Sequence, residues 1–185
     1  LKRRWADQSY IIFSCFEHKS SSCRLGKLEK TESSKTSEIG IRVIVKKKQS
    51  IISSTNLEKK NIDYLIEKVL EMSKVVPKDE YCGLADETQI YKPNQSEIDS
   101  LELFDPYEPD IKYINEKVLS LEGAALSNSK ISNSEGAELS FSKSNFILMA
   151  SNGLISEISK THSDYIVAVL AGKKNSMERA YDYKS

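Results

Sequence analysis

The spacing of apolar and polar positions divides the chain into a β-rich beginning, a helical middle and a β-rich end. Ser9–Glu17 is rich in aromatic and β-branched residues, which is typical of a buried strand. Ser22–Glu32 predicts a weaker strand, with a bulge at Gly26. Two further apolar runs, Ile39–Val45 and Ser50–Ser53, predict a hairpin whose lysine-rich tip stays in water.

Two helices are expected in the middle of the chain. Thr55 and Glu58 have the spacing of a capping box, and apolar residues repeat at helical spacing after them until Pro77 ends the run. Pro109–Leu126 predicts a second helix, because proline suits a first turn and one apolar stripe follows it. Gly123 is expected to weaken the last turn of that helix.

The segment between these helices, Lys78–Asp105, is long and irregular, with a short strand expected at Thr88–Tyr91. Loops of this length often belong to binding or interface regions. After the second helix the periodicity again becomes that of strands, which are expected at Ala137–Ser142, Phe146–Ala150, Leu154–Ile158, Asp164–Ala171 and Met177–Tyr183. The third and fourth of these form either one long bent strand or two.

Two turns separate the later strands. Asn152-Gly153 predicts a tight type I′ hairpin, and Gly172–Asn175 predicts another turn. Strands segregated from helices indicate an α+β fold, in which two antiparallel meanders form a sheet and two main helices pack on it.

The composition narrows the classes of function. The chain has 185 residues, which we interpret as a single domain spanning residues 1–185. Lys+Arg and Asp+Glu number 27 each, so the basic excess expected of a nucleic-acid-binding protein is missing. No apolar run approaches the roughly 20 residues of a membrane-spanning helix, and no secretory signal is visible, so we expect a cytoplasmic protein.

Residues capable of catalysis are scattered. His18 and His162 each lie far from any cysteine, so a zinc site within the chain is not expected. Cys15 and Cys23 lie in expected strands, where a small buried apolar side chain is the simpler interpretation. Cys82, in the long loop, is the cysteine to test for reactivity. The common hydrolase and nucleotide-binding motifs are missing from the sequence.

Several segments together resemble the amino-terminal domain of the TldD/PmbA family, closest to the PmbA (TldE) branch. They are Ser53–Leu57 before the first helix, Cys82–Asp86 in the loop, Ile131–Gly136, and Ser176–Tyr183. Each motif alone is weak, but their order and spacing are fairly specific. The resemblance runs from about Ala6 to Tyr183.

We interpret a set of positions in these segments and in the Asn-Gly turn as family-signature residues with structural or interface roles. They are Ser54, Thr55, Gly83, Asp86, Asn133, Glu135, Gly136, Asn152, Gly153, Glu178 and Arg179. Glu178 and Arg179 are adjacent in an expected strand, so they point to opposite faces, and a structural salt bridge is the simplest role for either.

The resemblance implies a hetero-oligomeric, zinc-dependent peptidase that cleaves small or unfolded peptides. In this family the zinc motif belongs to the TldD partner, so we expect no catalytic residue, metal ligand or cofactor in this chain. The expected partners are a TldD-like subunit or a second copy, and a peptide substrate, but neither a membrane nor nucleic acid. The family name "modulator of DNA gyrase" gives no reason to expect direct DNA binding by a neutral chain.

The chain departs from the family pattern in two respects. The family domain opens with a helix, whereas here Leu1–Trp5 alone precedes the first strand. The family also continues into a carboxy-terminal half. We therefore expect this chain to correspond to a fragment of the family pattern.

Three functions remain open. The first is a non-catalytic part of a PmbA/TldE-like subunit. The second is a stand-alone peptide- or protein-binding module that uses a sheet edge and the 78–105 loop. The third is an independent hydrolase, for which no nucleophile–base pair is visible.

Overall fold

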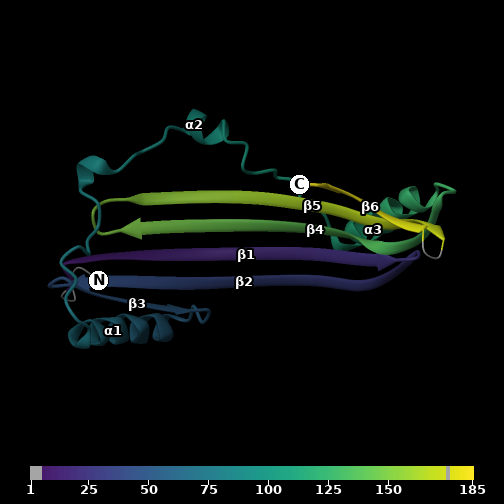
Figure 1. Cartoon of the computed structure of the whole chain (residues 1–185). Helices are drawn as coiled ribbons and strands as arrows, with labels where there is room; N and C mark the ends of the chain where they lie inside the picture. The colour runs from purple at the N-terminus through teal and green to yellow at the C-terminus, as the bar shows by residue number, and fades with distance from the viewer. Residues whose placement is uncertain (1–5, 174–175) are drawn as a thin grey trace. The chain divides into compact units, whose positions relative to one another are not determined.

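A computed structural model describes residues 6–173 and 176–185 of the chain (Figure 1). Six strands form one sheet in the order β3-β2-β1-β4-β5-β6. The strands are β1 (Gln8–Arg24), β2 (Lys27–Val45), β3 (Lys48–Ser54), β4 (Ile131–Ala150), β5 (Ile155–Lys173) and β6 (Ser176–Lys184). Three consecutive strands on each side of the helical region confirm the α+β prediction of two antiparallel meanders.

The helices are α1 (Lys59–Val75), the short 3-10 helix η2 (Glu87–Gln89), α2 (Gln95–Asp99) and α3 (Ile111–Leu126). Within the described part of the chain, no helix combines the length and apolar character needed to cross a membrane.

The described residues separate into two compact units. Among the described residues, the first unit comprises 6–15, 36–102 and 144–159, and the second comprises 16–35, 103–143, 160–173 and 176–185. Strands β1, β2, β4 and β5 therefore contribute residues to both units. The single-domain interpretation stays a prediction, and the expectation for Leu1–Trp5 falls outside the described residues.

The core of the first unit forms where α1 lies alongside β3 and covers β2 (Figure 1). Ile41 and Val43 of β2 are fully buried against Leu65 and Val69 of α1. Ile41 and Val43 are two residues apart, which places them on one face of the strand, and Leu65 and Val69 are four residues apart, which places them on one face of the helix. Ser50 of β3 donates from its hydroxyl to the Val69 carbonyl at 2.7 Å, which joins α1 to the sheet.

The predicted β2–β3 hairpin is confirmed, with Ile39 paired with Ser54 and Val45 paired with Lys48. Its turn residues Lys46 and Lys47 both have positive φ, as a type I′ turn requires.

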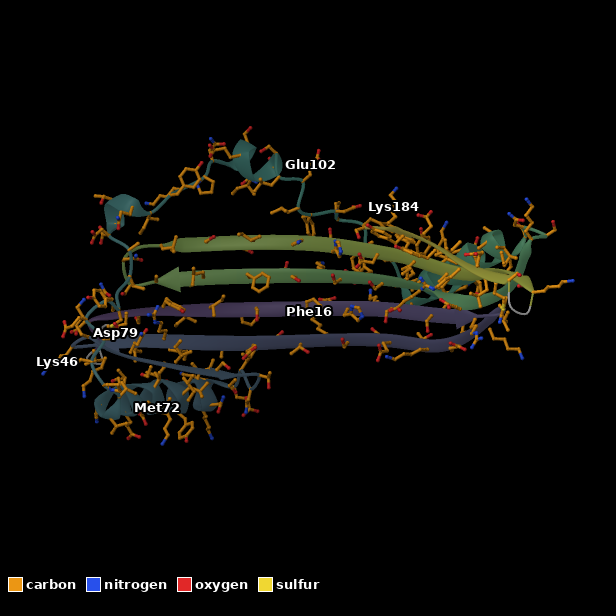
Figure 2. The ribbon with its side chains drawn as sticks, in the orientation of Figure 1. Phe16, Lys46, Met72, Asp79, Glu102 and Lys184 are labelled. Atoms are coloured by element: carbon orange, nitrogen blue, oxygen red, sulfur yellow. The ribbon has the colours of Figure 1, made fainter. Side chains whose placement is uncertain are left out.

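The lysines of this turn make more contacts than a solvated tip would. Lys47 Nζ donates to the Cys82 carbonyl at 3.2 Å, and Lys48 Nζ donates to the Lys74 carbonyl at 2.8 Å near the end of α1. Asp79 N donates to the Lys47 carbonyl at 2.8 Å, and Lys46 and Asp79 lie at the same end of this unit (Figure 2). The expectation that the lysines simply stay in water is therefore incomplete.

The first helix is confirmed, but the predicted Thr55–Glu58 capping box is wrong. Glu58 itself is the N-cap and makes no side-chain capping bond. The Asn56 side chain instead accepts from Glu58 N at 2.9 Å, and the Ser54 hydroxyl accepts from Asn56 N at 3.0 Å. An Asn turn thus replaces the cap, because Asn and Ser readily bond to backbone N–H groups two residues on.

The strand expected at Thr88–Tyr91 is also wrong, because this segment contains the 3-10 helix η2. Asp86 and Gln89 close a capping box around it, and Asn94 and Glu97 close a second one at α2. Polar side chains that satisfy local backbone groups favour such short turns over an isolated strand.

The core of the second unit packs α3 against β4 and β1. Ile114 and Val118 of α3 are fully buried with Cys23 of β1 and with Leu139 and Phe141 of β4. The helix begins at Ile111 rather than in a turn containing Pro109, because Asp110 is the N-cap and its side chain accepts from Tyr113 N at 2.7 Å.

The strand predicted at Ser22–Glu32 is interrupted, because Leu25 and Gly26 form the turn that joins β1 to β2. Both residues have positive φ, so the glycine belongs to a hairpin turn rather than to a bulge.

The buried carboxylate of Glu122 on α3 holds this turn. It accepts from Leu25 N and from Gly26 N, each at 2.8 Å, and it also bonds to the Ser134 hydroxyl. Burial alone would raise the pKa of Glu122, but the hydrogen bonds from Ser134, Gly26 and Leu25 outweigh it and lower the pKa. The side chain is therefore an ionised structural acid.

The later strands are longer than the sequence predicts. β4 joins the two segments expected at 137–142 and 146–150, and β5 resolves the open alternative in favour of one strand. Gly153 has φ of +91° while Asn152 does not have positive φ, so the predicted type I′ turn is wrong. Gly153 N bonds to the Ala150 carbonyl at 3.2 Å, which fits a type I turn followed by a glycine bulge. The turn expected at Gly172–Asn175 falls partly outside the described residues.

The Glu122 carboxylate leads to a stability prediction. Glu122→Gln should lower the free energy of unfolding by about 2 kcal/mol at pH 7, since charge-assisted bonds to two N–H groups are weakened. The folded-state pKa is depressed, so this stabilisation is present above the unfolded pKa near 4.3 and is lost as pH falls through the folded value. Urea unfolding at pH 7 and at about pH 3 measures both effects.

Glu116→Gln, on the exposed surface of the same helix, is the control and should change the unfolding free energy by less than about 0.5 kcal/mol. Equal effects of the two substitutions would contradict the assignment.

Gly136 and Gly123 give a matched pair of glycine substitutions. Gly136 has φ of +116°, and an added Cβ would lie 2.8 Å from the Cys23 carbonyl oxygen, so Gly136→Ala should destabilise by about 2 kcal/mol or more. Gly123 lies within α3 and its added Cβ would meet nothing within 4 Å, so Gly123→Ala should stabilise by about 0.5–1 kcal/mol. Thermal unfolding of the two variants distinguishes them, and destabilisation by both would be the contrary result.

Candidate functional site

An open cavity of about 780 Å³ lies in the second unit. Its inner surface comes from α3 and β4, through Leu121, Leu139 and Phe141. Leu139 and Phe141 are themselves 2% and 4% exposed, so the cavity reaches down to the core. Concave sites with an apolar base and a few polar groups are the usual form of ligand sites in proteins.

Three tyrosines line the cavity, namely Tyr107, Tyr113 and Tyr165. The rings of Tyr107 and Tyr113 meet edge to face, with centroids 5.9 Å apart and an interplanar angle of 79°. Partial burial and the neighbouring Tyr113 both raise the pKa of Tyr107. The Tyr107 phenol is therefore a neutral hydrogen-bonding group at physiological pH.

The lining also includes three consecutive residues of β5, Thr161, His162 and Ser163. His162 Nε2 lies 2.9 Å from Asp164 Oδ1, and the Ser185 hydroxyl donates to the same carboxylate oxygen at 2.8 Å. In a hydrolytic triad the imidazole contacts the hydroxyl that it activates. Here serine and histidine each bind the carboxylate, which is not that order of contacts.

The segment Leu103–Asp105 lies against β5 beside the cavity. Thr161 N donates to the Leu103 carbonyl at 2.9 Å, and Asp105 N donates to the Thr161 hydroxyl at 2.8 Å. The ladder between β5 and β6 runs from Tyr165, paired with Lys184, to Lys173. Figure 2 labels Lys184 at the end of β6. Along β5, Thr161 thus bonds to the loop residue Leu103, and Tyr165 pairs with Lys184 of β6.

The family-signature positions in the first unit have mainly local structural contacts. Ser54 bonds to Asn56 N and also accepts from Asn61 Nδ2 at 3.1 Å, while Thr55 is exposed at the bend. Asp86 caps η2.

Gly83 lies beside Gln8, whose side chain accepts from Leu84 N at 2.9 Å. Asn152 Nδ2 donates to the Ala85 carbonyl at 2.9 Å, so the loop residues and the β4–β5 turn meet. Gly153 completes that turn.

The signature positions in the second unit surround an irregular stretch of β4. The Asn133 side chain accepts from Ser134 N at 2.8 Å, and the Ser134 hydroxyl accepts from Gly136 N at 2.9 Å while it bonds to Glu122. The glycine is required here because its added Cβ would collide with the backbone of β1.

Glu135 and Arg179 form a salt bridge, with Arg179 Nε 2.6 Å from Glu135 Oε2. Arg179 also lies over the Tyr181 ring, 5.2 Å from its centroid. A structural salt bridge was the role expected for Arg179, and the contact is consistent with it. Glu178 is exposed and lines a second, smaller hollow of about 640 Å³ with Lys130 and Lys173.

The cysteines and histidines do not form a metal centre among residues 6–173 and 176–185, where no group of three or more potential ligands occurs. The rings of His18 and Phe16 stack, with their centroids 6.2 Å apart. All three cysteines are free thiols. Burial, followed by the nearby Glu122 charge and its hydrogen bond, raises the pKa of Cys23 to about 11. Cys82, the cysteine singled out for a test of reactivity, is only 5% exposed.

Sequence reasoning missed Glu122 and the cavity. Glu122 follows Ile114 and Val118 at steps of four residues, and all three are fully buried. A carboxylate at that spacing within an apolar stripe was the available signal. The cavity joins segments far apart in the sequence, for which no local pattern exists.

Comparison with known proteins agrees with this fold. The family described as PmbA/TldA metallopeptidase domain 1 matches residues 17–73. A search of curated proteins found no match.

Solved structures match almost the whole chain. TldE from Thermococcus kodakarensis is 17% identical in sequence, with a TM-score of 0.80. The match covers 98% of this chain and 40% of the TldE chain. A candidate modulator of a DNA gyrase from Thermotoga maritima is 13% identical, with a TM-score of 0.78. The match covers 96% of this chain and 39% of the Thermotoga chain. A candidate modulator of DNA gyrase from Bacteroides thetaiotaomicron is 16% identical, with a TM-score of 0.74. The match covers 98% of this chain and 41% of the Bacteroides chain.

The predicted resemblance to the amino-terminal domain of the TldD/PmbA family is therefore confirmed. The chain spans about two fifths of the length of these solved chains.

The burial of the cysteines predicts their order of reactivity. Cys15 is partly exposed, whereas Cys82 and Cys23 are 5% and 1% exposed. A thiol reagent applied to the folded chain should label Cys15 at least about tenfold faster than the others, since reaction needs an accessible thiolate. Cys15→Ser should remove the fast phase and Cys82→Ser should leave it. Loss of the fast phase in Cys82→Ser would instead identify Cys82 as the reactive thiol and contradict the prediction.

Proposed function

We propose that this chain, which resembles the first domain of the PmbA/TldD family, is a non-catalytic amino-terminal part of a PmbA/TldE-like subunit. The complete assembly would be a zinc-dependent peptidase acting on small or unfolded peptides. The observation that carries the proposal is the structural match to TldE over 98% of the chain at a TM-score of 0.80. The family match at residues 17–73 supports it independently.

The chemistry of the described site suits binding better than bond cleavage. The cavity offers apolar surface, tyrosine phenols and hydroxyl groups, which can orient a peptide. Peptide hydrolysis also requires an activated water or nucleophile. In this proposal a TldD-like partner holds the zinc and supplies the activated water, and this chain contributes contacts to the partner and to the peptide.

The remaining expectations belong to the same proposal. The partner is a TldD-like subunit or a second copy, the compartment is the cytoplasm, and any link to gyrase is indirect. The alternative of a stand-alone binding module is not favoured, because the structural match extends over nearly the whole chain to a part of much longer proteins.

Co-purification with a TldD-like subunit tests the proposal. The chain and a TldD-like subunit should elute together in size-exclusion chromatography, and zinc should be found in the partner but not in the isolated chain. Cleavage of an unfolded peptide should require the partner and increase when the chain is added. The partner alone and the chain alone are the controls.

Two results would contradict the proposal. One is separate elution at micromolar concentrations of both proteins, and the other is stoichiometric zinc in the isolated chain.

A further inference from the structure

We propose that the segment Leu103–Pro109 is a movable lid of the cavity in the second unit, and that Glu108 is its latch. The lid borders the cavity directly, because three of its residues line the space that reaches Leu139 and Phe141, namely Asp105, Tyr107 and Pro109. The cavity is already open on part of its surface, so movement of the lid changes the width of the opening. The proposal concerns access to the cavity and does not rest on the proposed function.

The latch residue Glu108 lies between two lysines from different strands. Its Oε1 is 2.7 Å from Nζ of Lys19 on β1, and its Oε2 is 3.4 Å from Nζ of Lys143 on β4. The Lys19 ammonium group also donates to the Pro109 carbonyl at 3.1 Å. The hydrogen bond from Lys19 is the main cause that lowers the pKa of Glu108, so the carboxylate is ionised at neutral pH. One side chain thus ties the lid to two strands of the sheet.

The other attachments of the lid are few. Thr161 N donates to the Leu103 carbonyl at 2.9 Å, which is the one backbone–backbone hydrogen bond between the lid and the sheet among the described residues. The Thr161 hydroxyl accepts from Asp105 N at 2.8 Å, and the Tyr107 ring meets Tyr113 of α3 edge to face. Tyr107 nevertheless stays 55% exposed. A segment with few backbone bonds and little buried apolar surface opens more readily than the core beneath it.

The residues at the ends of the lid suit a movement of the segment as one piece. Glu102, which Figure 2 labels directly before the lid, has φ of +47°, a conformation that is uncommon for a residue with a side chain. Asp110, directly after the lid, is the N-cap of α3. Pro106 and Pro109 fix two φ angles inside the lid. Hinge motions are usually absorbed at such residues beside the end of an element, while the stiffer segment between them moves.

Amide hydrogen exchange of the full chain, followed by NMR, measures how often the lid opens. The N–H groups of Thr161 and Asp105 are both bonded between lid and sheet, so they exchange when the lid is open. Glu108→Gln should speed both exchange rates about threefold to tenfold, because two ion pairs of the latch are lost. The amide of Val118 in the core should keep its rate. Glu116→Gln, which removes a surface ion pair on α3, is the matched control and should change none of these rates.

A double-mutant cycle tests whether the three charged residues act as one latch. Lys19→Gln combined with Lys143→Gln should speed exchange by a similar factor to Glu108→Gln. Adding Glu108→Gln to that pair should raise the rates by less than about twofold more, because the same contacts are already lost.

A bulky maleimide tests whether the movement widens the cavity. The thiol introduced by Leu121→Cys, in a chain that also carries Cys15→Ser, lies in the cavity lining on α3. Glu108→Gln should speed its labelling by about the same factor as the amide exchange, since both depend on the open lid. Ser163→Cys lies in the lining on β5 and takes the place of Leu121→Cys if that variant is unstable.

Four outcomes would overturn this proposal. They are unchanged exchange at Thr161 and Asp105 in Glu108→Gln, an equal effect of Glu116→Gln, fully additive effects in the cycle, and unchanged labelling of the thiol in the cavity. The experiments contain no partner, zinc or peptide, so the proposed function is judged separately.

Discussion

The buried carboxylate of Glu122 is the interaction on which the second unit depends. It receives the N–H groups of Leu25 and Gly26 at the β1–β2 turn and the hydroxyl of Ser134 on β4. Leu25 has φ of 51°, a conformation that costs a leucine roughly 1–2 kcal/mol. Hydrogen bonds from both turn N–H groups to an ionised acceptor can offset that cost. One side chain of α3 thus fixes a turn, a helix and an irregular strand together.

This interaction also changes how the signature residues are understood. Ser134 and Gly136 are joined by a hydrogen bond, and Gly136 leaves room for the Cys23 carbonyl. The segment Ile131–Gly136 therefore specifies how β4 passes β1 and α3 in this unit. Its most visible exposed contact, Glu135 with Arg179, is a surface ion pair that contributes little energy by itself. The contacts of the signature residues in this segment therefore serve the fold more than a binding surface.

Elements with a strong local period could be predicted from the sequence, and turns with unusual backbone could not. Both main helices and the β2–β3 hairpin follow from apolar spacing and from Pro77. The β1–β2 turn was missed because leucine disfavours positive φ, so Leu25 gave no turn signal and Gly26 was interpreted as a bulge. Asn152 did not adopt the positive φ that Asn-Gly suggests, because Gly153 alone supplies it in the longer turn. Glu122 was visible as a charge in an apolar stripe, but its four donors come from β1, β4 and the β1–β2 turn, which no pattern in α3 specifies.

A shared fold leaves the chemistry of a site open, so the function has to be argued from the groups that the site contains. In the described cavity, His162 and Ser185 each bind Asp164, and the other polar groups of the lining are hydroxyls, phenols, the Asp105 carboxylate and the Lys184 ammonium group. Such groups can hold a peptide but lower no barrier unless they are placed against the reacting bond. Under the proposed function, binding energy gained in this unit would position the peptide for a zinc centre in the partner. The choice of peptide would then depend on this cavity, and changes in the cavity would alter selectivity more than the rate of the chemical step.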